Sequence, residues 1–326
     1  MNDIDQLLIG DLGGTKVLLG IAEAGAIRLS RRYASADFSD FSDLLATFFA
    51  ETGCDPTQIT GGCLAIAGPI ADDGASARLT NLPWRIDRAA LSRRFGLPPL
   101  RLVNDFAAAA LGAVTAAETQ RLTLQAGLPL ADAPCLVVGA GTGLGMAIVL
   151  PENRPGQRPR WRILPGEGGH LAFAPADEEQ LALWRFLRTR HPRVIWEHVV
   201  SGPGIGAIHE CLTGERLAAD AISARALASA SAAAADPAWR SLDLFFAAYG
   251  AFAGDMALAC LPRGGVFLAG GIAARLASLL PRSRFLAAFN AKAEHADLVA
   301  HMPVHVATDP ALGLHGAWLL ANETTG

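Results

Sequence analysis

Two glycine-rich turns of similar design carry residue types that suit phosphate binding. The first, Asp11–Lys16 (DLGGTK), joins two apolar runs, and the second, Gly139–Gly145 (GAGTGLG), also has a threonine at its centre. Successive glycines let backbone N–H groups approach an anion, a threonine hydroxyl adds a donor, and an aspartate at a strand end could hold a metal that travels with phosphates. The first turn alone fits a tight hairpin with solvated side chains equally well. Together the turns predict a polyphosphate held from both sides, although neither is a Walker A loop.

A polar pair, Asn104 and Asp105, follows a short apolar run and opens an alanine-rich segment. This order places an amide and a carboxylate at the C-terminal end of a strand, where open α/β sheets bind their ligands. Asp105 could accept a proton from an attacking hydroxyl group, and Asn104 could hold a neighbouring hydroxyl. The alternative is that the pair serves as a helix N-cap, which is common for both residue types.

Glu167 and His170 lie on the glycine-rich segment Leu164–His170 (LPGEGGH), which has no local structural need for either side chain. A carboxylate accepts hydrogen bonds and an imidazole can accept or donate, so the two suit vicinal hydroxyl groups. We do not expect His170 to bind a metal, because no H-x-x-x-H pattern or cysteine cluster accompanies it. Gly202–Ala207 matches the loose G-x-G-x-x-A form of a dinucleotide fingerprint but lacks its strand-turn-helix context, so we discount it.

Strands alternating with helices must position these residues, and this alternation predicts an α/β fold. Because the strand-turn-strand opening occurs twice, we expect two related halves. The expected strands are Leu7–Ile9, Val17–Ile21, Gly62–Ala67, Leu100–Val103, Cys135–Val138, Met146–Leu150 and Gly265–Ala269. The expected helices are Phe41–Glu51, Asp105–Leu111, Glu178–Arg190, Arg193–Val200, Ala218–Ala235 and Pro237–Cys260.

The length of 326 residues exceeds what one hydrophobic core usually supports, so two domains are expected. Charged residues make up 18% of the chain, against about 25% in a typical globular protein, and this composition excludes intrinsic disorder. The net charge of −4 gives no bulk electrostatic reason to bind nucleic acid or an anionic membrane, so a small substrate is expected. The five cysteines are scattered, and no signal peptide or membrane span is expected, which predicts a cytoplasmic protein with free thiols.

Taken in order, the motifs resemble those of the bacterial glucokinases, in the hexokinase–actin-like superfamily. The resemblance covers nearly the whole chain, and the ordered set is far more specific than any one motif. The motifs are D-x-G-G-T at 11–15, T-N-L-P-W at 80–84, N-D-F-A at 104–107, G-A-G-T-G-L-G at 139–145, P-G-E-G-G-H at 165–170, S-G-P-G at 201–204, G-G-V-F-L-A-G-G-I at 264–272 and L-G-L-H-G-A at 312–317.

The resemblance implies two ribonuclease H-like (actin-like ATPase) α/β domains flanking a central cleft. The small domain would comprise residues 1–115 with about 312–326, and the large domain residues 116–311. Asp105 would be the general base on the sugar 6-hydroxyl. The sugar would also meet Asn81, Asn104, Glu167, His170 and Glu197. ATP would meet Asp11, Gly13, Gly14, Thr15, Lys16, Gly141, Thr142, Gly143, Gly270 and Gly271, with Mg²⁺ on its phosphates facing Asp11 directly or through water.

The implied activity is transfer of the ATP γ-phosphoryl group to O6 of D-glucose, feeding glycolysis, in a cytoplasmic homodimer. Position 16 is Lys, whereas close relatives within the glucokinase subgroup often have Asn there. Lys occurs at this position in the neighbouring repressor/open-reading-frame/kinase family. That family commonly carries a zinc-binding cysteine cluster after its E-G-G-H-like motif. Nothing of that kind follows His170, and no DNA-binding helix-turn-helix precedes residue 7, which favours a glucokinase without zinc. The alternatives are a kinase for mannose, fructose, glucosamine or N-acetylmannosamine, and a non-catalytic sugar-binding regulator.

Overall fold

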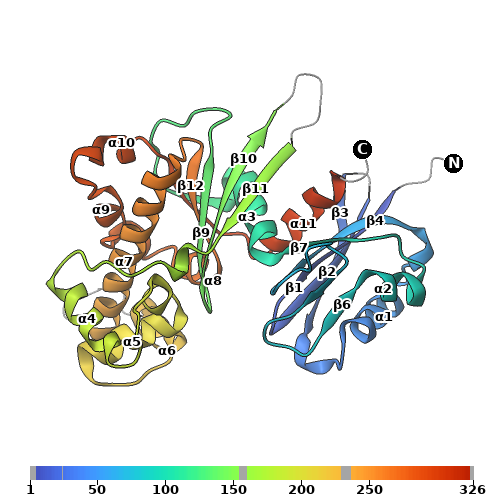
Figure 1. The fold of residues 1–326 in the computed structure, drawn as a ribbon, viewed down its shortest axis with the longest axis horizontal. Coiled ribbons are helices and arrows are strands. Elements are labelled where there is room, and N and C mark those ends of the chain that lie inside the picture. Colours follow the sequence, from blue (N-terminus) through green and yellow to red (C-terminus); the bar gives the residue numbers. More distant parts are fainter. Residues whose placement is uncertain (1–4, 24, 154–159, 229–235, 324–326) are drawn as a thin grey trace. The chain divides into compact units, whose positions relative to one another are not determined.

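The structure is a computed structural model that describes residues 5–23, 25–153, 160–228 and 236–323 (Figure 1). The chain divides into two compact units, which we call the small unit and the large unit. The small unit is Met1–Thr115 with Ala311–Gly326, and the large unit is Ala116–Pro310. The last residues of the small domain that we expected, 324–326, lie outside the described residues.

The small unit is built on a five-stranded sheet of order β3-β2-β1-β4-β7. The first three strands are antiparallel, because short turns join them, and β4 and β7 run parallel to β1. Leu12 pairs with Ile66, and Ile66 with Asn104, so β1, β4 and β7 end together at one edge of the sheet. The strands are β1 (Gln6–Leu12), β2 (Lys16–Glu23), β3 (Ala26–Ala34), β4 (Ile59–Ile66) and β7 (Arg101–Asn104), with a separate hairpin of β5 (Ser76–Arg78) and β6 (Arg85–Asp87).

Helices cover both faces of this sheet: α1 and α2 lie on one face, and α3 with α11 on the other (Figure 1). The apolar face of α1 packs on the sheet, and Asp40 caps its first turn by accepting from the N–H of Asp43. The helix ends at Gly53, whose φ of 68° suits a residue without a side chain. The helices are α1 (Phe41–Thr52), α2 (Arg88–Phe95), α3 (Asp105–Thr115) and α11 (Leu312–Asn322).

The backbones of α3 and α11 approach each other closely at two glycines. A Cβ atom on Gly316 would overlap the carbonyl oxygen of Ala108, and one on Gly112 would overlap the carbonyl oxygen of Leu312. Since α3 begins at Asp105, this glycine contact fixes the helix that carries the expected general base.

The large unit repeats the strand order of the small unit. Its six-stranded sheet has the order β11-β10-β9-β12-β13-β8, in which β9, β10 and β11 are antiparallel and β12 and β13 run parallel to β9. This correspondence confirms the prediction of two related α/β halves. The strands are β8 (Arg121–Gln125), β9 (Cys135–Ala140), β10 (Leu144–Glu152), β11 (Arg160–Gly166), β12 (Gly265–Ala269) and β13 (Val304–Ala307).

The central helix of the large unit is α7, Pro237–Cys260. It is long and apolar enough to cross a membrane by length and composition alone, but 72% of its most apolar window is buried inside the unit. Tyr249 in its middle is fully buried, so α7 is a core helix of the large unit. The other helices are α4 (Glu178–Arg188), α5 (Gly202–Thr213), α6 (Ala219–Ala228), α8 (Gly271–Arg275), α9 (Phe285–Asn290) and α10 (Ala296–Ala300).

The prediction of a helix over Arg193–Val200 is wrong. Only Trp196–His198 forms a short 3₁₀ turn, and Ile195 instead makes an antiparallel bridge with Ala172. Four residues of the segment are β-branched, which weakens helix formation. The helix α5 was not predicted. The helix expected over Ala218–Ala235 is observed as α6, and residues 229–235 lie outside the described part of the chain.

Candidate active site

The turn between β1 and β2 is held by backbone hydrogen bonds. The N–H of Gly13 donates to the carbonyl of Lys16 at 3.0 Å, and the Ser35 hydroxyl donates to the carbonyl of Gly13 at 3.0 Å. The side chains of Thr15 and Lys16 are exposed at this turn. The turn therefore has a fixed backbone with polar side chains that can meet a ligand.

Asp11 precedes this turn, on β1. The pKa of its carboxyl group is raised from 3.8 to about 6, chiefly by burial and also by the charge of Asp105, while Lys16 opposes the shift. The carboxylate lies against Gly313 at the start of α11, where a Cβ atom would be 2.6 Å from Asp11 Cγ. A carboxylate oxygen beside a phosphate-type turn is the kind of ligand that Mg²⁺ prefers, so the donor chemistry fits a metal carried on phosphates.

Asn81 packs against the same turn. A Cβ atom on Gly14 would be 3.1 Å from the Cβ of Asn81, so the absence of a side chain at position 14 makes room for it. The structure thus places a residue expected at the sugar directly beside a residue expected at the phosphates.

Asn104 and Asp105 mark the junction of β7 and α3, at the sheet edge where β1 also ends. Asn104 Oδ1 accepts from the N–H groups of Phe106 at 3.0 Å and Ala107 at 3.2 Å, so Asn104 does act as the helix cap. Its Nδ2 group is a donor that this capping does not use. Both interpretations of Asn104, as a cap and as a ligand for a hydroxyl, are therefore compatible.

The Asp105 carboxyl group is half-buried and has a raised pKa, chiefly because burial disfavours its charged form. The N–H of Phe106 donates to Asp105 Oδ1 at 2.9 Å and partly offsets this effect. A carboxylate whose pKa is shifted towards neutrality is a better proton acceptor than an ordinary surface aspartate.

The second turn, between β9 and β10, has its own supports. The N–H of Gly141 donates to the carbonyl of Gly143 at 2.8 Å, and the N–H of Gly202 donates to the carbonyl of Gly141 at 2.8 Å. The Glu197 carboxylate accepts from the N–H of Leu144 through Oε2 at 2.8 Å. The residue expected at the sugar again lies against the turn expected at the phosphates.

Glu167 and His170 lie where β11 ends and a 3₁₀ turn, Gly168–His170, begins. Both side chains are exposed, and His170 Nε2 is 4.0 Å from Glu167 Oε2. The carbonyl of Leu171 accepts from the N–H of Trp196 at 3.0 Å, which brings the segment carrying Glu197 alongside. The three residues predicted to bind hydroxyl groups therefore lie on neighbouring segments of the large unit.

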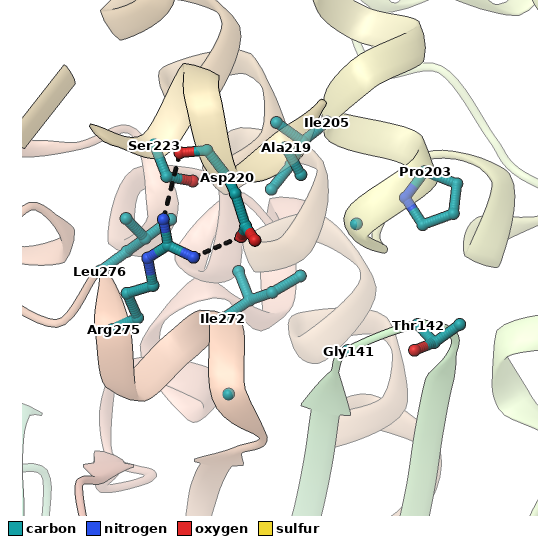
Figure 2. Close-up of a pocket in the computed structure, with 12 residues that line it drawn as sticks. Gly141, Thr142, Pro203, Ile205, Ala219, Asp220, Ser223, Ile272, Arg275 and Leu276 are labelled. Atoms are coloured by element: carbon teal, nitrogen blue, oxygen red, sulfur yellow. Dashed lines mark hydrogen bonds and ion pairs between the residues drawn. The ribbon is translucent and has the colours of Figure 1, made fainter. Parts of the chain in front are cut away.

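A cavity of about 380 Å³ opens beside the second turn, within the large unit. Its walls come from the turn, the first residues of α5, α6 and α8, as Figure 2 shows. Arg275 forms an ion pair with the Asp220 carboxylate and donates to the Asp220 carbonyl at 3.1 Å. The lining residues are Gly141, Thr142, Gly202, Pro203, Ile205, Ala219, Asp220, Ser223, Gly271, Ile272, Arg275 and Leu276.

The size and mostly apolar lining of this cavity suit a small organic group, such as a nucleoside. The sequence predicted three of its lining residues, Gly141, Thr142 and Gly271. Gly270 adjoins it and has a φ of 89°, where a Cβ atom would be 2.7 Å from the carbonyl oxygen of Ala140. The lining residues on α5 and α6 were not predicted, because the match at Gly202–Ala207 was discounted and no other motif with a recognisable binding chemistry falls on them.

Among the described residues, no group of three or more His, Cys, Asp or Glu side chains is arranged to hold a metal ion. The predicted residues fall into two sets, one in each unit. The small unit holds Asp11, Gly13, Gly14, Thr15, Lys16, Asn81, Asn104 and Asp105, and the large unit holds Gly141, Thr142, Gly143, Glu167, His170, Glu197, Gly270 and Gly271.

Comparison with known proteins gives matches over nearly the whole chain. The profile of the family described as Glucokinase matches residues 8–324. A glucokinase from Trichormus variabilis is 34% identical over 344 aligned positions, which cover 97% of this chain and 98% of that protein.

Solved structures show the same similarity in three dimensions. The crystal structure of a glucokinase from an Antarctic psychrotroph has a TM-score of 0.82 at 30% identity, covering 98% of this chain and 99% of that one. A ROK-family glucokinase from Streptomyces griseus, in complex with glucose and AMPPNP, shares the fold with a TM-score of 0.65 at 20% identity, covering 98% and 99% of the two chains. These similarities confirm the predicted α/β fold of the ribonuclease H-like (actin-like ATPase) type.

Proposed function

The chain belongs to the glucokinase family, and from this membership we propose that Asp105 deprotonates O6 of D-glucose as the γ-phosphoryl group of ATP is transferred to it. As a member of this family, the chain is an ATP-dependent hexose kinase that produces glucose 6-phosphate. The observation that carries the proposed role is the position of Asp105, at the start of α3 and with a raised pKa.

Asp105 supplies the proton acceptor. Its Oδ1 atom accepts a hydrogen bond from the N–H of Phe106, which restrains the orientation of the carboxylate. Phosphoryl transfer demands little covalent chemistry from the protein, so catalysis consists mainly of positioning and charge stabilisation. A base held in one orientation contributes to both, because it aligns the attacking oxygen and removes its proton as the bond forms.

The other polar residues select and orient the sugar. Asn104 Nδ2 donates to a hydroxyl group beside the reacting one, since its Oδ1 is already used by the α3 cap. Glu167, His170 and Glu197 hold hydroxyl groups from the large unit, and Asn81 does so from the small unit. A wrong epimer would leave one of these groups without its partner, at a cost of about 1–3 kcal/mol for each buried group.

The two glycine-rich turns hold the ATP phosphates, and the cavity lined by α5, α6 and α8 takes the adenosine. Backbone N–H groups at the turns and the side chains of Thr15, Lys16 and Thr142 neutralise the developing charge. Asp11 would hold Mg²⁺ carried on the phosphates, directly or through water, and this ion would supply further charge neutralisation. We also place the enzyme in the cytoplasm, in keeping with the free cysteines found at all five positions, and we expect it to act as a homodimer.

A coupled assay of ADP release across a panel of hexoses tests the proposal. Glucose should give the highest kcat/KM, and mannose, fructose, glucosamine and N-acetylmannosamine lower values. The absence of ADP above background with every sugar would favour a non-catalytic regulator and contradict the activity. A higher kcat/KM for another hexose would keep the mechanism and correct the substrate.

The variant Asp105→Ala tests the base. Removing a general base usually lowers turnover by about 10²–10⁴-fold, and ATP should still bind, because the adenosine cavity lies wholly in the large unit. Near-wild-type turnover in this variant would show that the base is assigned wrongly.

A further inference from the structure

We propose that Glu197 positions the phosphate-binding turn Gly141–Leu144, and so supports nucleotide binding as well as sugar binding. This inference rests on the proposed function, which gives Glu197 a sugar-binding role only. The direct observation is that Oε2 of Glu197 accepts from the N–H of Leu144 at 2.8 Å.

Gly143 shows how closely the carboxylate lies against the turn. A Cβ atom at this position would be 3.2 Å from Glu197 Cδ and would overlap Oε2. Only glycine leaves this space for the carboxylate. The composition of the turn therefore fits Glu197 as well as it fits a phosphate.

The segment that carries Glu197 also holds the other end of the turn. The N–H of Gly202 donates to the carbonyl of Gly141 at 2.8 Å. The Ser201 hydroxyl donates to the Glu197 carbonyl at 2.7 Å and accepts from the N–H of Gly204 at 3.1 Å. One rigid piece, from Glu197 to the first turn of α5, thus fixes the turn at both ends.

This arrangement matters because glycines lose more conformational freedom than other residues when they are ordered. A turn that is already ordered presents its N–H groups to phosphate without that entropic cost at the moment of binding. A hydrogen bond to a carboxylate is also about twice as strong as one to a neutral acceptor. Removing the Glu197 side chain should therefore weaken nucleotide binding even when no sugar is present.

The hydrogen bond from the Leu144 N–H uses Oε2 of Glu197, so the other carboxylate oxygen, Oε1, is left for the proposed contact with a sugar hydroxyl group. Sugar binding that fixes the carboxylate then also fixes the turn. By thermodynamic linkage, the sugar and the nucleotide should raise each other's affinity by the same factor. Glu197 is in this sense a positioning residue for the phosphates.

The test is the affinity for ADP without sugar, measured by isothermal titration calorimetry on the full chain. Glu197→Ala should bind ADP about tenfold more weakly, as expected for the loss of a hydrogen bond to a charged group. Glu197→Gln keeps an oxygen acceptor for the Leu144 N–H and should stay within about threefold of wild type. Glu178→Ala is the matched control, because its exposed carboxylate lies at the start of α4 and outside the proposed site, and its ADP affinity should not change.

A second variant, Gly143→Ala, tests the same contact from the side of the turn, so the conclusion does not depend on the Glu197 substitutions alone. Gly143→Ala pushes the carboxylate away in the wild-type chain, so it should weaken ADP binding there. In the Glu197→Ala background the added methyl group has room, and the same change should cost much less. A double-mutant cycle measures this difference directly.

Three outcomes overturn the proposal. These are unchanged ADP affinity in Glu197→Ala, an equal loss in Glu197→Ala and Glu178→Ala, or fully additive effects of the Gly143 and Glu197 substitutions. A melting temperature for each variant separates these results from unfolding. The proposed function is judged independently, by whether the wild-type enzyme releases ADP with glucose.

Discussion

Replacing Gly316 with alanine should disturb catalysis from a position outside the proposed substrate site. Gly316 lies on α11 where that helix meets α3, and a Cβ atom there would be 2.5 Å from the carbonyl carbon of Ala108. An ordinary contact of this kind begins at 3.4 Å, and the carbonyl oxygen of Ala108 is nearer still, so the helices must separate by at least about 0.9 Å (3.4 − 2.5). Both surfaces are backbone, so no flexible side chain can move aside.

The stability cost follows from two opposing effects. Overpacking of this kind typically costs about 1–3 kcal/mol, and backbone against backbone places it near the upper value. Alanine gains about 1 kcal/mol over glycine inside a helix. The net loss is then about 2 kcal/mol, confined to the small unit.

The effect on turnover is expected to be larger than the effect on stability. Ala108 lies one turn after Asp105 on α3, so a shift at Ala108 moves the proposed general base as well. A displacement of about 1 Å in a reacting group can cost about 10²-fold in rate. We expect kcat to fall by about that factor, while ADP affinity is retained, because the nucleotide cavity belongs to the large unit.

Hydrogen exchange on peptides from α3 and α11, together with kcat from the ADP-release assay, measures both effects. Gly271→Ala is the control for stability, because nothing lies within 4 Å of the added Cβ atom at that helical glycine. It should leave exchange in α3 and α11 as in the wild type. If Gly316→Ala shows wild-type exchange and a kcat within about threefold of wild type, the argument that this helix contact positions Asp105 is refuted.

Three further predictions concern separate parts of the molecule. The folded-state pKa of Asp11 lies at about 6, above its ordinary 3.8, so its contribution to stability is fully present below about pH 3.8 and is lost as the pH rises through 6. Urea melts at several pH values should show that Asp11→Asn removes this pH dependence and raises the free energy of unfolding at pH 8. Tyr249→Phe loses the hydrogen bond of its hydroxyl to the Val138 carbonyl, 3.0 Å long, and urea melts should show a loss of about 1 kcal/mol. Arg275→Ala breaks the exposed ion pair with Asp220 at the cavity. Steady-state kinetics should show a two- to fivefold rise in the KM for ATP, about the free energy that an exposed ion pair contributes, and no change in the KM for glucose.

The fold was predictable where hydrophobic periodicity is strong. The buried positions of α1 recur at helical spacing, and the all-buried strands β9 and β12 are continuous apolar runs. The strand β3 was not predicted, because it lies at the sheet edge and carries three arginines. Its pairing partner β2 determines its conformation, and that information is not local in the sequence.

The missed helix α5 shows a different limitation. Its first turn contains Gly202, Pro203 and Gly204, which normally indicate a loop. The signal that could have revealed it is the N-cap Ser201 followed by a proline in the first turn, a common helix start. Glycine is needed at 204 because a Cβ atom there would be 2.5 Å from the carbonyl carbon of Val199, so a packing constraint outweighs helix propensity.

The types of the candidate site residues were predictable, whereas their contacts with one another were not. Motifs suggest chemistry one residue at a time, so they assigned Asn81 and Glu197 to the sugar and the glycine turns to the phosphates. The structure places Asn81 against Gly14 and Glu197 against Gly143, one pair in each unit. In both pairs, a glycine that could have been explained by phosphate alone also makes room for a polar side chain. Because five strands of the large unit repeat the strand order of the small unit, the recurrence of this pairing indicates that the space beside each turn is a property of the fold. We therefore expect sugar and phosphate recognition to share it.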